Sequence, residues 1–121
     1  MKRDMDLVRK ILLEATAREG ADRGGNPRLA GYMDDQVTHP VYLMQRGGLV
    51  EAATWRPLDG SPQTAILTSV TWAGHDFLDA ARNETVWNQA RAKAGAAGVE
   101  LSFATLKELL VATAKGLLGL P

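Results

Sequence analysis

Two stretches of the chain decide its fold: RGGLVEA, residues 46–52, and LTSVTWAGHDFLD, residues 67–79. In the first, two glycines stop a helical pattern and an apolar pair begins an extended segment. In the second, a run rich in β-branched residues reaches Thr71, a residue type that caps helices, and an apolar helical pattern follows. An Asp-Gly pair between them marks a turn. The two stretches therefore predict a β-hairpin of residues 49–57 and 64–72, entered from one helix and left by another.

Three further segments have the periodicity of amphipathic helices. Residues 4–18 repeat apolar side chains every third or fourth position, and a second segment begins at Asn83 and extends to about residue 94. The third begins at Ser102 and has a broad apolar face made of Phe103, Leu106, Leu109, Leu110, Ala114 and Leu117. This face is either part of the intrachain core or a dimer contact. The alanine- and glycine-rich AGAAGVEL before it is expected to be a linker.

The segment between the first helix and the hairpin contains one residue that does not fit its pattern. LAGY, residues 29–32, is a candidate for a short extended piece, and a helical stretch follows from Asp34 with a stripe of Val37, Val41 and Met44. Pro40 falls inside that stretch, where proline costs about 3 kcal/mol through a lost hydrogen bond and a steric clash. We therefore expect a kink or break near Thr38, which would cap a new helix with Pro40 in its first turn.

Length and composition indicate one globular domain. The chain has 121 residues, of which 45% are apolar and 23% charged. It contains no cysteine, which excludes disulfides and thiolate metal sites and favours a reducing compartment. The charged start, MKRDMDLVRK, is not a signal peptide, and no apolar run is long enough to span a bilayer. We expect a cytoplasmic protein with no membrane partner.

The charge balance argues against a large nucleic-acid-binding surface. The 14 basic and 14 acidic residues give a net charge of zero. Residues 1–28 carry a net +2 and residues 29–60 a net −2. Phosphate neutralisation supplies most of the affinity of a DNA-binding protein, so a neutral chain is not expected to bind DNA tightly as a monomer. A local basic patch is still compatible with these numbers.

The order of the predicted elements is that of a winged helix-turn-helix domain. In winged-helix regulators, a glycine and an apolar pair link the recognition helix to the first wing strand, and Thr and Gly begin the helix after the second. The matching residues here are Gly48, Leu49, Val50, Thr71 and Gly74. The resemblance implies an α+β fold: a winged helix-turn-helix-like domain with a three-helix core, a β-hairpin wing and additional C-terminal helices.

This fold predicts one domain with two functional segments. Residues 1–94 would form the winged-helix-like core, with the wing at about residues 49–72. Residues 95–121 would form a C-terminal helix that packs on the core or contacts a second copy as a homodimer.

Three longer motifs carry a closer resemblance: MKRDMDLVRKILL, GYMDDQV followed by LMQRGGLVEA, and TWAGHDFLDAARNETVW. Together they resemble a family of small uncharacterised proteins from bacteria and their phages. The resemblance covers nearly the whole chain and implies a winged-helix-like fold, a cytosolic setting and a phage connection. It implies no catalytic residue. The sequence departs from the family pattern at Pro40, which puts a standard recognition-helix geometry in doubt.

His75, Asp76 and Asp79 form the one cluster that invites an enzymatic interpretation. His75 and Asp79 share a helix face, but Asp76 points about 100° away, and the chain has one other histidine, His39. A metal site needs three or four converging ligands. We instead expect His75 to pack beside the hairpin and the acidic residues to lie near the positive end of a helix dipole. The prediction is a protein without catalytic residues, metal or cofactor.

The candidate DNA-binding residues are polar side chains of the second helix and the hairpin: Thr38, His39, Tyr42, Gln45, Arg46, Arg56 and Gln63. Gln and Arg read base edges, and Thr and Tyr bind phosphate oxygens. Candidate phosphate clamps are Arg3, Arg9, Lys10 and Arg28.

Acidic residues oppose this interpretation. Asp59 lies in a hairpin tip without Lys or Arg, and Asp34 and Asp35 precede the second helix. The leading hypothesis is nevertheless a transcription-regulator-like protein that binds double-stranded DNA. The alternative is a protein-interaction module on the same fold. The three tryptophans, Trp55, Trp72 and Trp87, are expected to pack in or near the core.

Overall fold

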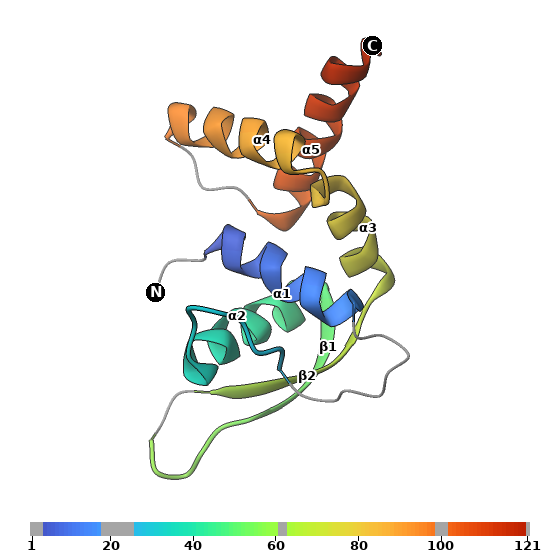
Figure 1. Ribbon diagram of the computed structural model, residues 1–121. Helices are drawn as coiled ribbons and strands as arrows, with labels where there is room; N and C mark the ends of the chain where they lie inside the picture. The colour runs from blue at the N-terminus through green and yellow to red at the C-terminus, as the bar shows by residue number, and fades with distance from the viewer. Residues whose placement is uncertain (1–3, 18–25, 61–62, 99–101, 121) are drawn as a thin grey trace. The chain divides into compact units, whose positions relative to one another are not determined.

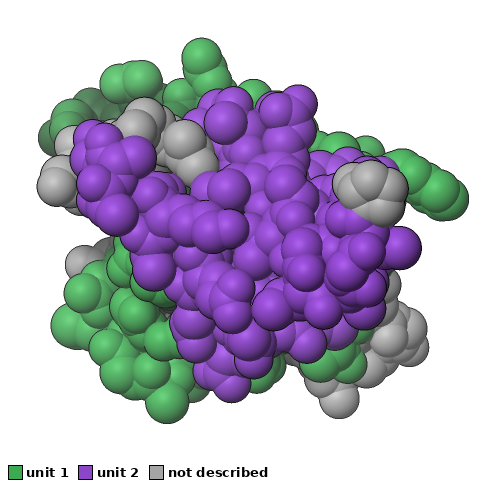
Figure 2. Space-filling view, turned by 90° about the horizontal axis from the view of Figure 1, so that it is seen from above, with its two compact units in different colours: residues 1–75 green, residues 76–121 purple. Residues whose placement is uncertain are grey.

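The computed structural model describes residues 4–17, 26–60, 63–98 and 102–120. These residues form an α+β structure with five α-helices and one two-stranded antiparallel sheet (Figure 1). In chain order the elements are α1 (Met5–Ala17), α2 (Asp34–Arg46), β1 (Val50–Trp55), β2 (Thr64–Val70), α3 (Trp72–Ala81), α4 (Glu84–Ala97) and α5 (Phe103–Leu118). The chain divides into two compact units, residues 1–75 and 76–121, coloured separately in Figure 2. The boundary falls within α3. The predicted functional division near residue 94 stays a prediction.

The first predicted helix is confirmed as α1. The side chain of Asp4 caps it by accepting a hydrogen bond of 3.1 Å from the amide of Leu7. Within unit 1 the helix packs against α2 and β2. Its buried residues, at i, i+3, i+4 and i+7 spacings, are Met5, Leu7, Val8, Ile11, Leu12 and Ala15. Burial of this apolar surface is what holds a 13-residue helix, too short to be stable alone, in place.

Of the kink or break expected near Thr38, the break with a new helix capped by Thr38 is wrong, because α2 runs without interruption through Pro40. Pro40 is itself buried, on the same side of the helix as Val37, Val41 and Met44, each at most 1% exposed. The proline ring therefore adds to the apolar surface that packs against α1 and the sheet. This tertiary burial offsets the local cost of proline, which periodicity and propensity alone do not weigh.

The extended segment expected at residues 29–32 is also wrong, because these residues form a turn. The amide of Tyr32 donates to the carbonyl of Leu29 at 3.1 Å, and Gly31 has φ +85°. A glycine with positive φ at the third position is typical of a type II turn. The turn leads directly into α2, where the amide of Met33 donates to the side-chain oxygen of Gln36 at 2.7 Å.

The end of α2 and the start of the hairpin follow the prediction. Gly48 has φ +80°, and the amide of Leu49 donates to the carbonyl of Met44 at 2.9 Å, which closes the last turn. β1 and β2 then pair in antiparallel register, from Val50 opposite Val70 to Trp55 opposite Thr64. Both strands are a little shorter than predicted.

A β-bulge near the base of the hairpin sets which side chains face the core. The register shifts between Glu51 and Ala52, so β2 carries one extra residue at this level. Val50, Ala65 and Leu67 are buried. Towards the loop the side chains of β1 become exposed on both faces, and Figure 1 shows the hairpin extending away from α1 and α2. The hairpin is thus a buried base with a projecting, solvated end.

Unit 2 is built from the C-terminal part of α3 with α4 and α5. Asn83 caps α4 by accepting from the amide of Val86 at 3.0 Å, and Ser102 caps α5 by accepting from the amide of Thr105 at 3.2 Å. The Ser102 cap was predicted, and the helix start at Asn83 was predicted as well. α4 is longer than expected, because the helix includes Ala94–Ala97 of the predicted linker and ends at Gly98, with φ +69°.

α4 and α5 pack against each other, and the rings of Phe77 and Phe103 meet edge to face with centroids 5.7 Å apart. Of the predicted apolar face of α5, Leu106 and Leu110 are fully buried, whereas Leu117 is half exposed. Burial of the first two shows that at least this part of the face belongs to the intrachain core.

The prediction for the three tryptophans holds for one of them. Trp87 is buried in α4, but Trp55 is 46% and Trp72 85% exposed. Trp55 lies on the projecting end of the hairpin, and Trp72 is the first residue of α3. Among the described residues, no helix is both long and apolar enough to cross a membrane.

Candidate functional site

The two sequence stretches that predicted the fold meet at one junction in unit 1. Thr71 stands directly before α3, and its hydroxyl donates to the carbonyl of Gly48 at 2.6 Å. The same hydroxyl oxygen accepts from the amide of Gly74 at 3.1 Å, which caps α3. The backbone amide of Thr71 donates to the carbonyl of Leu49 at 3.1 Å. One threonine thus joins the end of α2, the base of the hairpin and the start of α3.

The junction leaves no room for a side chain at position 74, and Gly74 meets this requirement. A Cβ atom there would overlap the carbonyl oxygen of Leu49 and lie 2.8 Å from Cγ1 of Val70. Neither the backbone carbonyl nor a side chain in the buried base can give way easily. The spacing of Thr71 and Gly74 therefore has a physical cause: the threonine bonds to the chain after α2, and the glycine lets α3 lie against it.

The sequence analysis did not predict a further pair of long-range hydrogen bonds, which lies at the edge of β2 that is not paired with β1. The side-chain nitrogen of Asn26 donates to the carbonyl of Ala65 at 2.9 Å, and its side-chain oxygen accepts from the amide of Leu67 at 2.9 Å. Residues two apart present their backbone groups to the same edge of a strand. A single side-chain amide therefore bonds to β2 as a neighbouring strand would. No sequence signal marks this contact, because its partners lie 39 and 41 residues away.

The α2 candidates lie together on one face of the helix. At 100° per residue, the positions of Thr38, His39, Tyr42, Gln45 and Arg46 span about 120° of the helix surface. Val37, Pro40, Val41 and Met44 occupy the opposite side and are buried. All five candidates are half-buried or exposed. The structure thus brings the predicted helix residues into one polar face, which we call the α2 polar face.

Arg46 is partly ordered by its neighbour one helical turn earlier. Its Nη1 donates to the hydroxyl of Tyr42 at 3.3 Å, and its guanidinium carbon lies 5.9 Å from the centre of the tyrosine ring. Cation–π contacts at such exposed sites stabilise by about 0.5–1 kcal/mol. The stacking leaves the guanidinium at the exposed end of the α2 polar face, where it can donate further hydrogen bonds to an anion.

The two hairpin candidates lie beside each other but away from the sheet's buried base. Arg56 follows β1 and Gln63 precedes β2, one step beyond the last paired residues of the strands. Arg56 is exposed and Gln63 half-buried. Their place at the projecting end of the hairpin suits contact with a large partner.

Three of the four phosphate-clamp candidates, Arg9, Lys10 and Arg28, lie among the described residues. Lys10 stacks on Tyr32, with Nζ 5.4 Å from the ring centre, and Arg28 is exposed. Arg9 is half-buried and takes part in an interaction within the chain. Arg3 lies outside the described residues.

Acidic residues balance the charge of unit 1. Residues 1–75 contain nine basic and nine acidic side chains, so this unit has no net charge. Asp59 is exposed in the hairpin loop. The α2 polar face is therefore a local feature on a neutral unit, and its attraction for a polyanion is short-ranged.

The His75, Asp76 and Asp79 cluster does not form a multi-ligand centre in the described part of the chain. No group of three or more His, Asp or Glu side chains in that part is arranged to hold a metal ion. Asp76 instead faces Lys107 in unit 2, with Oδ2 and Nζ 3.9 Å apart, and Asp79 is exposed. His75 has an interaction of its own within the chain.

Comparison with known proteins identifies the family. Residues 2–100 match the model of a family described as hypothetical protein, DUF2513. The chain belongs to this family. An uncharacterized protein of Haemophilus influenzae is 33% identical over 110 residues, which cover 90% of this chain and 92% of the relative. No solved structure matches the chain.

The resemblance to a family of uncharacterised proteins is thus confirmed. The DUF2513 match includes the junction, Asn26 and the whole α2 polar face, and it ends before α5. The features of unit 1 described above therefore lie within the residues that match the family model, and α5 lies after its last matched residue.

Proposed function

We propose that this DUF2513 protein is a winged-helix-like, transcription-regulator-like protein that binds double-stranded DNA through the α2 polar face. The observation that carries the proposal is the separation of polar and apolar side chains on α2. Five polar side chains lie on one face of the helix, and a fully buried apolar stripe lies on the other. A helix anchored in this way can present its polar face to the major groove while its other side stays in the core.

The chemistry of the face suits a nucleic acid. Gln45 and Arg46 can make bidentate hydrogen bonds to base edges, and the hydroxyls of Thr38 and Tyr42 can bind phosphate oxygens. The hairpin beside α2 would act as the wing, with Arg56 and Gln63 at its projecting end. Lys10 and Arg28 would contribute to phosphate binding, as would Arg9 and Arg3.

The neutral charge of unit 1 predicts weak binding whose affinity depends only modestly on salt concentration. With few phosphates neutralised, the logarithm of the binding constant should fall with the logarithm of salt concentration at a shallow slope, because the slope scales with the number of contacts. Fluorescence anisotropy with labelled genomic duplexes at low and moderate salt would measure both affinity and slope.

Arg46→Ala tests the role of the face directly. The substitution removes one guanidinium contact and should weaken DNA binding by about 1–3 kcal/mol. The matched control is Lys93→Ala, which removes one exposed positive charge from α4. Absence of binding at low salt, or equal effects of the two substitutions, would rule out the proposed DNA-binding face.

A second candidate function is protein recognition on the same fold. The observation in its favour is the exposure of three large apolar side chains of the hairpin, Trp55, Leu58 and Ile66. The hairpin loop that follows Arg56, residues 57–63, contains no Lys or Arg. Aromatic side chains of this kind anchor protein interfaces. Co-purification from the native cytosol should then recover a protein whose capture is lost with Trp55→Ser and retained with Arg46→Ala; the reverse result favours DNA.

A cytoplasmic location and a prophage origin are implied by the resemblance and belong to the same proposal. Genes for phage proteins flanking the coding sequence would support the prophage origin, and an unbroken bacterial operon would contradict it.

A further inference from the structure

α5 has a second apolar stripe, opposite the one that packs on α4. Ala104, Val111 and Leu118 recur every seven residues and therefore fall in line along the helix. All three are exposed, Val111 to 38% and Leu118 to 72%. On the opposite side, Leu106, Leu110 and Thr113 are buried. We call the stripe of Ala104, Val111 and Leu118 the α5 seam.

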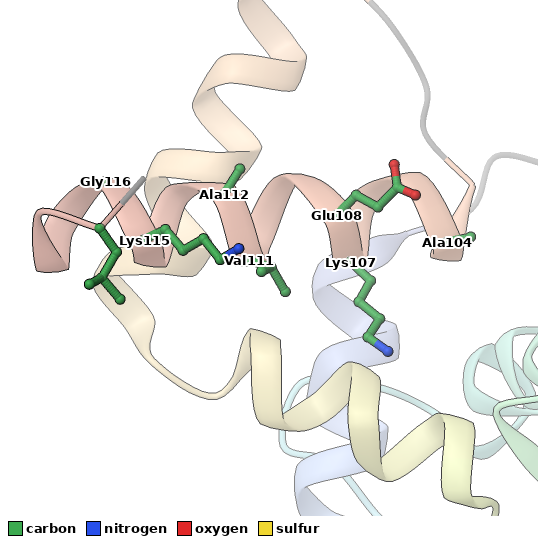
Figure 3. Close-up of a pocket in the computed structure, with 8 residues that line it drawn as sticks. Ala104, Lys107, Glu108, Val111, Ala112, Lys115 and Gly116 are labelled. Carbon is green, nitrogen blue, oxygen red and sulfur yellow. The ribbon is translucent and has the colours of Figure 1, made fainter.

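Charged and small side chains flank the seam (Figure 3). Glu108 and Lys115 lie on one flank, four residues after Ala104 and Val111 respectively. Lys107 and Ala114 lie on the other flank, three residues after the same two positions. Beyond the helix, the amide of Leu120 donates to the carbonyl of Lys115 at 2.8 Å, which folds the chain end back beside this face. The seam thus has the layout of a helix-pairing surface: apolar in the middle and charged at the edge.

We propose that the α5 seam pairs with the seam of a second copy of this chain in an antiparallel, twofold-symmetric homodimer. With the twofold axis at the level of Val111, each residue of the seam faces the seam residue equally distant from Val111 on the other copy. Val111 then meets Val111, and Ala104 meets Leu118. A small side chain faces a large one at both ends, so the two helices can approach evenly along the seam.

Charge complementarity selects this partner and this direction. The twofold axis keeps each flank on its own side, so Glu108 of each copy lies beside Lys115 of the other, which gives two ion pairs per dimer. Lys107 faces Ala114 and can keep its contact with Asp76. A parallel pair would instead place Glu108 beside Lys107, which already contacts Asp76, and would align the two helix dipoles unfavourably.

The inference is independent of the proposed DNA binding. It concerns unit 2, and the assembly can be measured without nucleic acid. In this dimer α5 has two apolar stripes with different partners. The buried stripe packs in the core of its own chain, and the α5 seam packs against the second copy.

Sedimentation of the full chain over a range of concentrations provides the first test. We expect a reversible dimer that Val111→Lys weakens at least about tenfold, because each dimer would bury two lysines at its centre. Ala92→Lys is the matched control, since it adds the same charge at an exposed site on α4 and should leave the dimer unchanged. Circular dichroism would confirm that both variants are folded.

A wild-type chain that stays monomeric would overturn the proposal and would mean that another part of the chain or another protein covers the seam. A dimer unaffected by Val111→Lys would also overturn it, since the contact would then lie elsewhere.

Introduced cysteines test the direction, and the chain has no cysteine of its own to confuse the result. In a mixture of Ala104→Cys and Leu118→Cys chains, an antiparallel seam should form disulfides between the two variants under mild oxidation. Cross-links of each variant with itself would show a parallel pair and would contradict the proposal.

Charge reversal gives a third measurement. Glu108→Lys should weaken the dimer several-fold, because it places two lysines together twice in each dimer. Adding Lys115→Glu in the same chain should restore the dimer. If the second substitution fails to rescue the first, Glu108 and Lys115 do not meet.

Discussion

Units 1 and 2 are stabilised in different ways. In unit 1, polar contacts join segments far apart in sequence: Asn26 bonds to residues 39 and 41 positions away, and Thr71 to a residue 23 positions away. In unit 2, the hydrogen bonds by which Asn83 and Ser102 cap their helices are local, and each spans three residues. The contacts between distant segments of unit 2 are the packing of α4 on α5, the contact of Phe77 with Phe103 and an exposed ion pair of Asp76 with Lys107.

This difference determines which positions tolerate change. A hydrogen bond between distant segments depends on one side chain, and its loss leaves buried or half-buried backbone groups without a partner. A local cap affects a single helix end, whose groups can turn to water. We therefore expect matched substitutions to cost more in unit 1 than in unit 2.

The largest contrast should come from two helical glycines. Gly74→Ala forces a Cβ into the carbonyl of Leu49 and should lower the free energy of unfolding by about 3 kcal/mol or more, as overpacking against backbone does. Gly95→Ala in α4 meets no atom within 4 Å and should raise it by about 0.5–1 kcal/mol, since alanine is the better helix former. Urea denaturation followed by circular dichroism would compare them.

Hydrogen exchange would then show where Gly74→Ala acts. The loss of protection should concentrate in α2, the hairpin and the start of α3. If both alanine substitutions had the same effect, the close approach of α3 to the chain after α2 would be wrong.

The next contrast is between two asparagines. Asn26→Ala removes both hydrogen bonds to β2 and should lower the free energy of unfolding by about 2 kcal/mol. Asn83→Ala removes one cap bond and should cost about 1 kcal/mol. Thermal unfolding of both variants would measure the difference.

Asn26→Asp refines this comparison. The carboxylate retains the acceptor for Leu67 but loses the donor to Ala65, so at neutral pH the variant should not exceed wild-type stability. If Asn26→Ala and Asn26→Asp both melted at the same temperature as the wild type, the side-chain amide of Asn26 would not stabilise the edge of the sheet.

The smallest effect is expected at the ion pair of unit 2. Lys107 and Asp76 are 43% and 46% exposed, so solvent screens their interaction. Lys107→Ala should change the free energy of unfolding by less than about 0.5 kcal/mol, comparable to Lys93→Ala. A much larger loss on denaturation would mean that Lys107 has a structural role beyond this contact.

Local signals explain what could be predicted from the sequence. Asn83 and Ser102 mark helix starts because a capping side chain bonds three residues along the same chain. Thr71 and Gly74 indicated the turn from strand to helix for the same reason. In the α2 polar face, helix periodicity placed the five candidate residues on one side, and the structure agrees.

The predictions that are wrong concern residues whose conformation or burial depends on contacts with distant parts of the chain. Pro40 lies in an unbroken helix because its ring is buried by partners outside α2. Trp72 is exposed although an aromatic residue at the end of a predicted strand was expected to pack in or near the core, because the burial of a side chain at a helix start depends on the fold around it. Asn26 is ordinary in sequence, and its role depends on a strand that begins almost forty residues later.

The residue after Asn26 has a chemical consequence for the lifetime of this protein. Asparagine side chains in proteins age by deamidation when the next backbone nitrogen attacks the side-chain carbonyl. Here the next residue is Pro27, whose backbone nitrogen carries no hydrogen. The ring closure that begins deamidation is therefore blocked at Asn26. Deamidation there would replace the nitrogen that donates to the carbonyl of Ala65 with a carboxylate oxygen. The amide that bonds to β2 is therefore protected from the commonest spontaneous damage of its residue type.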